Sequence, residues 1–356
     1  MKKTLALTIS LLMVVVLLAA CGSNGTNNSS TGTNGGTATN EGTATASPEN
    51  EKQKRVALVL PEQIGVNPFF ASMDEGFKRA GEEFNVEVKT IESTDPAAFE
   101  QNLRAAVADN YDLIITATFQ AEDALNKVAP ENPDKPFAII DTIVNQPNVR
   151  SVVFREQEAA YLLGAAAGLS TKTNVVGAVV AMDTPLLKKY TFGFEQGLKS
   201  TNPDAKFLTN YVGNFNDSAK GKELALLQYS QGADFVAGMS AVGDLGVFEA
   251  AKEKGLYASG QDVDRTELDP EHIVLSQLKG TDAVAYETVK AFANDQFDFT
   301  ATDYGLKEKG VGLTFVTQDS KSALSPFVGE DTITKVKAIA EDIISGKVVV
   351  ELPAAK

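Results

Sequence analysis

The most constraining feature of this chain is a regular alternation of short apolar runs with longer amphipathic stretches, which extends from Arg55 to Val350. Short continuous apolar runs are typical of strands that are buried on both faces. Apolar residues at helical spacing, as between Phe69 and Phe84, indicate helices that pack on such a sheet. Together the two patterns predict an α/β fold of parallel sheets covered by helices.

The order of these segments predicts two consecutive βα runs. Strands are expected at residues 56–60, 86–91, 113–115, 137–140, 149–154, 175–180, 206–212, 235–237, 257–259, 273–277 and 312–316. Helices are expected at residues 69–84, 97–108, 121–128, 156–169, 186–199, 219–230, 247–254, 283–293 and 333–344, the last one capped by Gly346. Two such runs predict two doubly wound, Rossmann-like lobes.

The lobe limits follow from this order. We expect an N-terminal lobe of residues 54–153 plus about 278–312, and a C-terminal lobe of residues 154–277 plus about 313–350. Ligands of doubly wound sheets bind beyond the carboxyl ends of the strands. Two lobes that face each other can therefore share one ligand cleft, which closes by a hinge motion.

The N-terminal residues have the composition of an export signal. Lys2 and Lys3 precede an apolar run of about 14 residues at 5–18, which leads into Ala19-Ala20-Cys21. This order predicts a lipoprotein signal peptide at residues 1–20, and Leu18 to Cys21 resembles a bacterial lipobox. A membrane-spanning helix is the alternative, but a span needs about 20 apolar residues. Because Cys21 is the only cysteine, it cannot form an internal disulfide, and we expect it to carry lipid.

Residues 21–53 are expected to form a disordered, lipid-anchored tether. From Gly22 to Asn50 the chain is almost entirely Gly, Ser, Thr, Asn, Ala and Glu, which cannot bury enough surface to offset chain entropy. A flexible coil of this length reaches roughly 30 Å. We expect the protein at the extracytoplasmic face of a bacterial cell membrane, where stable anchoring needs two or more acyl chains such as palmitate.

The charge and the residue inventory exclude several function classes. The formal net charge of −15 argues against binding to nucleic acid or to anionic lipid. The chain has one histidine, His272, which we interpret as a surface or strand-edge residue, and one cysteine. A zinc site of the His/Cys type therefore has no ligand set.

The loop at residues 238–246 contains glycines but lacks phosphate-binding spacing, and we interpret it as a cleft-lining loop. No metal and no cofactor are expected.

Several segments in a fixed order resemble the basic membrane protein (BMP) family of lipoproteins, which includes purine nucleoside receptors of ABC importers. The resemblance extends from about Arg55 to Val350 and implies the fold of type I periplasmic binding proteins. The matching segments are residues 137–141 (FAIID), 151–168 (SVVFREQEAAYLLGAAAG), 193–197 (GFEQG), 213–217 (GNFND), 221–223 (GKE), 243–252 (GDLGVFEAAK), 260–264 (GQDVD) and 276–279 (SQLK).

One loop departs from the family pattern. Nucleoside receptors of the family usually carry an Asp-Asp-x-Ser-Phe-Asn loop after the first strand, whereas this chain has GVNPFF at residues 65–70. The acidic pair is missing, and the sequence Asn-Pro-Phe-Phe resembles the first loop of ribose- and galactose-type binding proteins. A sugar therefore stays an alternative ligand.

Aromatic residues follow predicted strands in both lobes. Phe69 or Phe70 follows the first strand, and Phe215 follows the strand that ends near Val212, so one aromatic ring from each lobe can sandwich a ligand ring. The family resemblance implies that Phe69 and Phe215 are this pair. The alternative is that either residue belongs to a helix-start core. Asn67 and Phe119 are further candidates, with loop and packing roles as their alternatives.

Charged residues also follow predicted strands. Asp141 follows the strand at 137–140 and can accept hydrogen bonds from base N–H groups or sugar hydroxyls, unless it caps a loop or helix. The family pattern implies that Asp262 and Lys279 bind ribose hydroxyls, and a surface ion pair between them is the alternative. Arg155 lies beside the expected first crossing between the lobes and is a candidate hinge or cleft residue.

These features favour a binding protein over an enzyme. We expect a monomeric receptor that captures a nucleoside, preferably a purine nucleoside, and delivers it to an ABC permease. A sugar receptor of the same fold and a lipoprotein that presents its ligand to a signalling protein are the alternatives. An enzyme is disfavoured because the chain has one histidine and no nucleophile motif.

Overall fold

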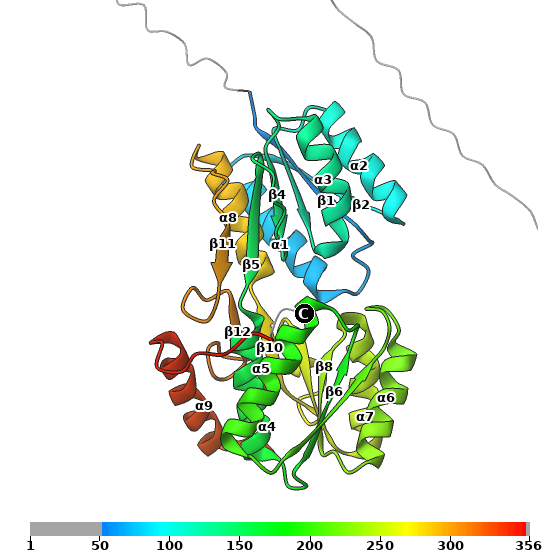
Figure 1. The fold of residues 1–356 in the computed structure, drawn as a ribbon, viewed down its shortest axis with the longest axis vertical. Helices are drawn as coiled ribbons and strands as arrows, with labels where there is room; N and C mark the ends of the chain where they lie inside the picture. Colours follow the sequence, from blue (N-terminus) through cyan, green and yellow to red (C-terminus); the bar gives the residue numbers. More distant parts are fainter. Residues whose placement is uncertain (1–51, 354–356) are drawn as a thin grey trace, which may run out of the picture. The chain divides into compact units, whose positions relative to one another are not determined.

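The computed structural model describes residues 52–353 (Figure 1). The predicted signal peptide at residues 1–20, the lipidation site Cys21 and the tether up to Glu51 lie outside the described residues. The described part contains two six-stranded sheets, each with helices on both faces. This arrangement confirms the predicted α/β fold with two doubly wound lobes.

The first sheet has the strand order β11-β5-β4-β3-β1-β2, and all of its strands are parallel. Its strands are β1 (Arg55–Leu60), β2 (Glu87–Glu92), β3 (Leu113–Ala117), β4 (Phe137–Ile140), β5 (Val149–Phe154) and β11 (Thr302–Tyr304). Its helices are α1 (Pro68–Glu83), α2 (Pro96–Ala108), α3 (Glu122–Glu131) and α8 (Thr281–Ala293), and the 3₁₀ turn η1 (Phe119–Ala121) precedes α3.

The second sheet has the order β12-β10-β9-β8-β6-β7, in which only β12 runs antiparallel to its neighbour. Its strands are β6 (Val175–Val180), β7 (Lys206–Tyr211), β8 (Phe235–Met239), β9 (Tyr257–Asp262), β10 (Ile273–Lys279) and β12 (Val311–Leu313). Its helices are α4 (Glu156–Ser170), α5 (Pro185–Thr201), α6 (Ser218–Ser230), α7 (Asp244–Lys254) and α9 (Gly329–Ile344), with the 3₁₀ turns η2 (Ala241–Gly243) and η3 (Thr266–Leu268).

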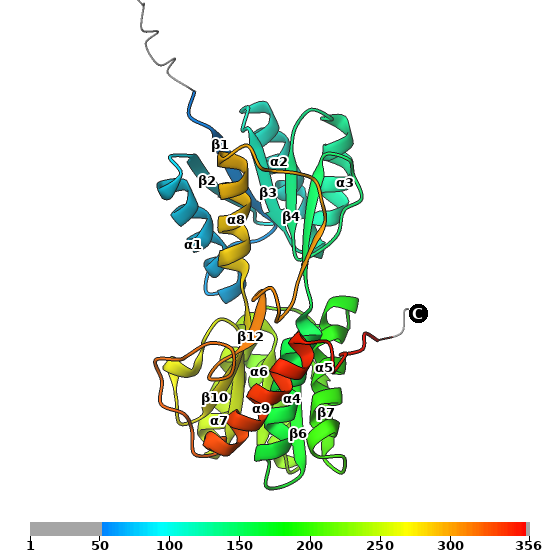
Figure 2. The ribbon, with the colours of Figure 1, turned by 90° about the vertical axis from the view of Figure 1, so that its left-hand side faces the viewer.

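The apolar strands are buried on both faces because successive side chains point to opposite sides of the sheet. In β1, Val56, Leu58 and Leu60 pack with the buried face of α1, whereas Ala57 and Val59 belong to a separate core with α2 and α3. Figure 2 shows α1 and α8 in front of this sheet, with α2 and α3 behind it. This double coverage explains why the strands read as continuous apolar runs in the sequence.

The chain crosses between the two lobes after β5, after β10 and after β11. The first and third crossings are joined by Arg155, whose backbone N–H donates to the carbonyl oxygen of Tyr304 (2.9 Å) and whose guanidinium pairs with Glu158 (2.7 Å) and Glu308. β10 extends to Lys279 and β12 starts at Val311, so α8 and β11 lie on the segment between the second and third crossings.

Two local expectations have a clear outcome. Gly346 follows α9 with a φ of 77°, in the left-handed region that glycine favours, as predicted for a helix cap. The strand expected at residues 312–316 ends at Leu313, because the chain turns at Phe315, which has a φ of 64°. The sequence did not predict β11, which contains the polar residues Thr302 and Asp303.

Candidate functional site

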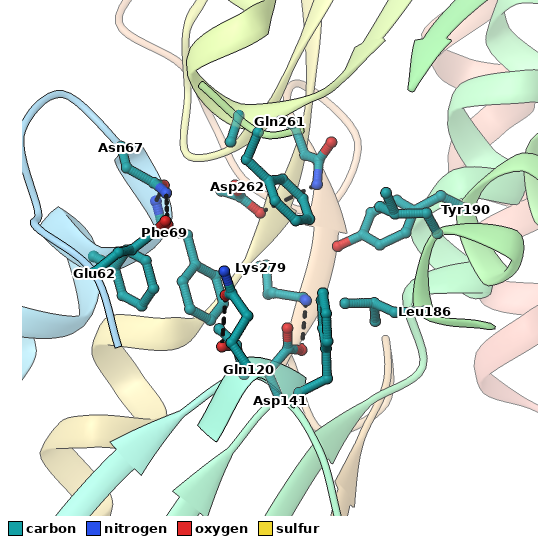
Figure 3. A pocket seen from close by; sticks show the side chains of 16 residues that line it. Glu62, Asn67, Phe69, Gln120, Asp141, Leu186, Tyr190, Gln261, Asp262 and Lys279 are labelled. Carbon is teal, nitrogen blue, oxygen red and sulfur yellow. Dashed lines mark hydrogen bonds and ion pairs between the residues drawn. The ribbon is translucent and has the colours of Figure 1, made fainter. Parts of the chain in front are cut away.

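A pocket lies between the two lobes, beyond the carboxyl ends of both sets of strands, and Figure 3 shows the side chains that line it. The lining residues come from strand ends and from the first turns of helices in both lobes. They are Glu62, Asn67, Phe69, Phe70, Thr118, Phe119, Gln120, Asp141, Leu186, Leu187, Tyr190, Phe215, Ala241, Gln261, Asp262 and Lys279. All eight residues that the sequence nominated for ligand binding are among them; their binding role stays a prediction.

Equivalent strand ends place polar side chains in the pocket from both lobes. Asp141 follows β4 with a φ of 78°, and Asp262 ends β9 with a φ of 70°. Asp and Asn tolerate this left-handed backbone better than most residues, because their short polar side chains can bond locally. The sharp change of direction at each strand end directs a carboxylate into the pocket instead of extending the sheet.

Lys279 connects the lobes through a buried ion cluster. Its Nζ lies 2.6 Å from Asp141 Oδ1 in the first lobe and 3.0 Å from Glu156 Oε1 at the start of α4. Glu156 also pairs with Lys189 (2.9 Å). All of these groups except Lys189 are buried. The alternative of a surface ion pair between Asp262 and Lys279 is therefore wrong, because both side chains are buried and Lys279 pairs with other carboxylates.

Burial sets the protonation of these carboxyl groups. It raises the pKa of Asp141 to about 7, although the attraction of Lys279 opposes the rise. Burial also acts to raise the pKa of Glu156, but the combined attraction of Lys279 and Lys189 lowers it below its usual value. The pKa of Asp262 is raised by burial, and Lys279 and Arg265 offset part of the rise. Glu156 is thus the firm anion of the cluster, while Asp141 can hold a proton near neutral pH.

Aromatic rings form much of the remaining wall. Phe69 and Phe70 meet edge to face with ring centroids 5.2 Å apart, and Phe119 from the first lobe lies 6.5 Å from Phe215 of the second. Lys279 Nζ lies 5.4 Å from the ring centre of Phe69, which adds a cation–π contact. Phe69 lines the pocket and also belongs to the core at the start of α1. The sandwich formed by Phe69 and Phe215 stays a prediction.

Asn67 begins α1 as its N-cap. Its side-chain Oδ1 accepts a hydrogen bond from the backbone N–H of Phe69 (3.1 Å), and its Nδ2 donates to Glu62 Oε1 (3.3 Å). Its expected loop role is therefore present, and the side chain still faces the pocket. Arg155, by contrast, lies at the crossing and is not among the lining residues.

The sequence analysis missed Glu62, Gln120, Tyr190 and Gln261. Gln261 directly precedes Asp262 at the end of β9. The strand was predicted to end at Ser259, three residues too early, so Gln261 was not recognised as a strand-end residue. Tyr190 reaches the pocket from the second turn of α5, where its apolar ring matched the helical core pattern. In the part of the chain that the structure covers, no group of three or more His, Cys, Asp or Glu side chains is arranged to hold a metal ion.

Comparison with known proteins agrees with this geometry. A family model described as "ABC transporter substrate-binding protein PnrA-like", named Bmp, matches residues 53–351. The chain belongs to the Bmp family. Its members are substrate-binding proteins of ABC transport systems, which capture a small molecule for a permease in the membrane.

Three relatives illustrate the similarity. The ABC transporter nucleoside-binding protein BmpA of Lactococcus lactis is 29% identical, over 98% of this chain and 99% of its own length. An uncharacterized lipoprotein of Pyrococcus abyssi is 30% identical, over 87% of this chain and 76% of its own. The crystal structure of a solute-binding protein of an ABC transporter system from Aeropyrum pernix superposes with a TM-score of 0.75 at 28% identity, covering 85% of this chain and 94% of that one.

The Bmp family assignment fits the two-lobed fold and the interlobe pocket. Among residues 52–353, no helix combines the length and the apolar character needed to cross a bilayer.

Proposed function

We propose that this Bmp-family protein is a lipid-anchored receptor that captures a nucleoside, preferably a purine nucleoside, and delivers it to an ABC importer. The observation that carries the proposal is the convergence of aromatic rings and buried charged groups from both lobes on one pocket. A nucleoside offers an apolar, stackable base and a ribose with neighbouring hydroxyls. Rings and hydrogen-bonding charges in one cleft suit both parts.

Asp262 and Lys279 are the proposed ribose-binding pair. A carboxylate accepts hydrogen bonds from hydroxyl groups, and an ammonium group donates them, so the two groups together can bind a diol. Both side chains are buried in the pocket wall and lie at the ends of the neighbouring strands β9 and β10. Phe69 and Phe215 are the proposed stacking residues, and Asp141 is proposed to accept a hydrogen bond from the ligand.

The proposed location is the extracytoplasmic face of the cell membrane, with lipid on Cys21. Support comes from the predicted signal at residues 1–20 and from relatives that are named lipoproteins. We propose further that the protein acts as a monomer, binds no nucleic acid and has no catalytic activity. Mass spectrometry of the mature protein would test the anchor, because a mature chain that begins before Cys21 contradicts it.

A sugar is the second candidate ligand, and the loop Asn67-Pro68-Phe69-Phe70 favours it. This loop lacks the acidic pair at positions 65 and 66 that is usual in nucleoside receptors of the family. Pro68 occupies the first turn of α1, and both phenylalanines reach the pocket, which suits packing against the apolar face of a sugar ring.

A thermal-shift screen of residues 52–356 against nucleosides, pentoses and hexoses tests the proposal. A ligand at 100 times its dissociation constant stabilises the folded state by about 2.7 kcal/mol. We expect purine nucleosides to raise the melting temperature most. A shift with sugars alone would contradict the nucleoside assignment, and turnover of a ligand would contradict the absence of catalysis.

A further inference from the structure

The loop between β1 and α1 contains a carboxylate that the sequence analysis did not consider. Gly65 and Val66 occupy the positions of the missing acidic pair, and both are exposed outside the pocket. Glu62, at the start of the same loop, lines the pocket instead. The chain therefore has a carboxylate in this part of the site, but it projects from a different position of the loop.

Asn67 holds this carboxylate in place. Figure 3 shows the two side chains together at one end of the pocket, with the Asn67 amide directed at Glu62. Asn67 is 5% exposed, and both ends of its amide are engaged, one by the cap of α1 and the other by Glu62. Through the bond from its Nδ2, Asn67 acts as a positioning residue for Glu62.

The surroundings of Glu62 are amides rather than cations. The side chains of Gln120 in the first lobe and Asn216 in the second act with Asn67 to lower the pKa of Glu62, whereas the larger effect of burial raises it. Thr118 donates to the Oε1 atom of Gln120 (3.0 Å), which leaves the NH₂ group of this amide to face other acceptors. Within residues 52–353, Glu62 has no ion pair with a lysine, arginine or histidine.

A carboxylate of this kind selects its ligand by hydrogen-bond polarity. It can only accept hydrogen bonds, and it has two oxygens side by side. A heterocycle that presents a ring N–H next to an NH₂ group satisfies both oxygens at once. A heterocycle that presents a ring nitrogen lone pair next to an NH₂ group donates a hydrogen bond to one carboxylate oxygen and places its lone pair against the other oxygen, which is repulsive. The first arrangement occurs on guanosine, and the second on adenosine.

We propose that Glu62 is a specificity-determining residue that selects a ligand edge with two adjacent N–H donors, positioned for this task by Asn67. The inference rests on the proposed nucleoside-binding function. It assigns the polar selection at this end of the pocket to Glu62.

Calorimetric titration of the wild type and Glu62→Gln with guanosine and adenosine tests the inference. The amide of glutamine presents one donor and one acceptor, which matches the adenosine edge better than the guanosine edge. We expect the wild type to prefer guanosine, and Glu62→Gln to lower that preference at least tenfold, as for the loss of a charged hydrogen bond. Glu92→Gln is the matched control. Glu92 accepts a hydrogen bond from the Ile64 N–H on the same loop but does not line the pocket. The Glu92→Gln variant should therefore keep the wild-type preference for guanosine over adenosine.

Asn67→Ser separates the positioning role from folding. Serine can still cap α1, so the melting temperature should stay close to that of the wild type, but serine is too short to donate to Glu62. We expect the guanosine preference to fall part of the way toward that of Glu62→Gln. A wild type that prefers adenosine, or a preference that Glu62→Gln leaves within twofold, would overturn the inference while the nucleoside function stands. A wild type that binds no nucleoside would overturn both.

Discussion

The two lobes share one strand order and differ in a side chain at one equivalent strand end. The strand order β5-β4-β3-β1-β2 of the first sheet corresponds to β10-β9-β8-β6-β7 of the second. Left-handed residues lie at or just beyond the ends of equivalent strands, with Thr118 and Asp141 in one lobe and Ala241 and Asp262 in the other. By register, the last residue of β5 is Phe154, and its counterpart on β10 is Lys279. An apolar ring in one lobe thus corresponds to a buried cation in the other.

This difference shows how a symmetric frame gives an asymmetric site. Lys279 approaches the ring of Phe154 (5.2 Å), its own counterpart, and forms an ion pair with Asp141 instead of Asp262. The two equivalent aspartates therefore have different surroundings. Asp141 has an ammonium group at hydrogen-bond distance, whereas the contact of Asp262 is the amide of Gln261 at 3.5 Å. The strand ends are repeated in the two lobes, and the unrepeated Lys279 gives the two equivalent aspartates different electrostatic surroundings.

Removal of that side chain is expected to have the largest effect. Lys279→Met leaves Asp141 and Glu156 buried without their shared cation, and we expect the free energy of unfolding to fall by about 3–5 kcal/mol. Urea denaturation measures the loss. Lys290→Met is the control, because Lys290 contacts Glu287 and the ring of Tyr286 at the surface, and its removal should change stability by less than about 0.5 kcal/mol. Equal losses of unfolding free energy in the two variants would show that Lys279, the residue in which the lobes differ, does not stabilise the protein.

The protonation of Asp141 gives a pH signature. Its pKa rises from 3.8 to about 7 on folding, so between these values the folded protein holds a proton that the unfolded chain has lost. Stability relative to Asp141→Asn should therefore be highest near pH 4 and fall by roughly 1–3 kcal/mol as the pH rises to 7. Asp244, whose pKa burial also raises to about 7, contributes equally to both proteins. A stability difference that is flat from pH 4 to 7 would contradict the raised pKa.

Asp262 tests the other lobe through ligand binding. Asp262→Ala would leave ligand hydroxyls without an acceptor, and we expect affinity for the ligand found in the screen to fall by about 1–3 kcal/mol. Calorimetric titration measures this change. Asp183→Ala serves as a control on the same lobe, since Asp183 is exposed and pairs with Lys188 outside the pocket. Unchanged affinity in Asp262→Ala would remove this residue from the site.

The smallest effects concern the repeated helix caps. Asp95 accepts hydrogen bonds from two backbone N–H groups at the start of α2, whereas its counterpart Asp217 accepts one, from Lys220, at the start of α6. We expect Asp95→Ala to cost about 1–2 kcal/mol and Asp217→Ala about 0.5–1 kcal/mol in chemical denaturation. A larger loss of stability in Asp217→Ala than in Asp95→Ala would show that the number of cap hydrogen bonds does not determine which cap stabilises the protein more.

The fold was predictable wherever the burial of an element produced a regular pattern of apolar residues in the sequence. Buried parallel strands such as β1 and β6 are continuous apolar runs, and their bounds were predicted within one residue. The end of β9 was predicted too early because Gly260, Gln261 and Asp262 are small or polar, and the last two line the pocket. β11 carries no apolar run, and its pairing with β5 depends on the second crossing, which returns the chain to the first lobe and brings residues far apart in the sequence together.

The site was predictable where it follows strand ends. Asp141, Asp262 and Lys279 come directly after or at the end of apolar strands, and parallel sheets gather such positions at one edge. Glu62 was not predicted because it lies three residues before the loop positions 65 and 66 at which the family pattern has its acidic pair. Glu156 was missed because it begins a helix, and only the first crossing brings it beneath Lys279.

The start of β1 has a mechanical consequence. Arg55 lies at the end of this strand remote from the pocket, and the preceding residue, Lys54, is bonded to the carbonyl oxygens of Phe292 and Ala293 at the end of α8. β1 is a central strand, paired with β2 on one side and β3 on the other. Tension applied through residue 54 therefore loads both strand pairings in shear along their whole length, and hydrogen bonds strained together resist more force than bonds opened one at a time. Single-molecule pulling from residue 54 should give a higher rupture force than pulling from the edge strand β2.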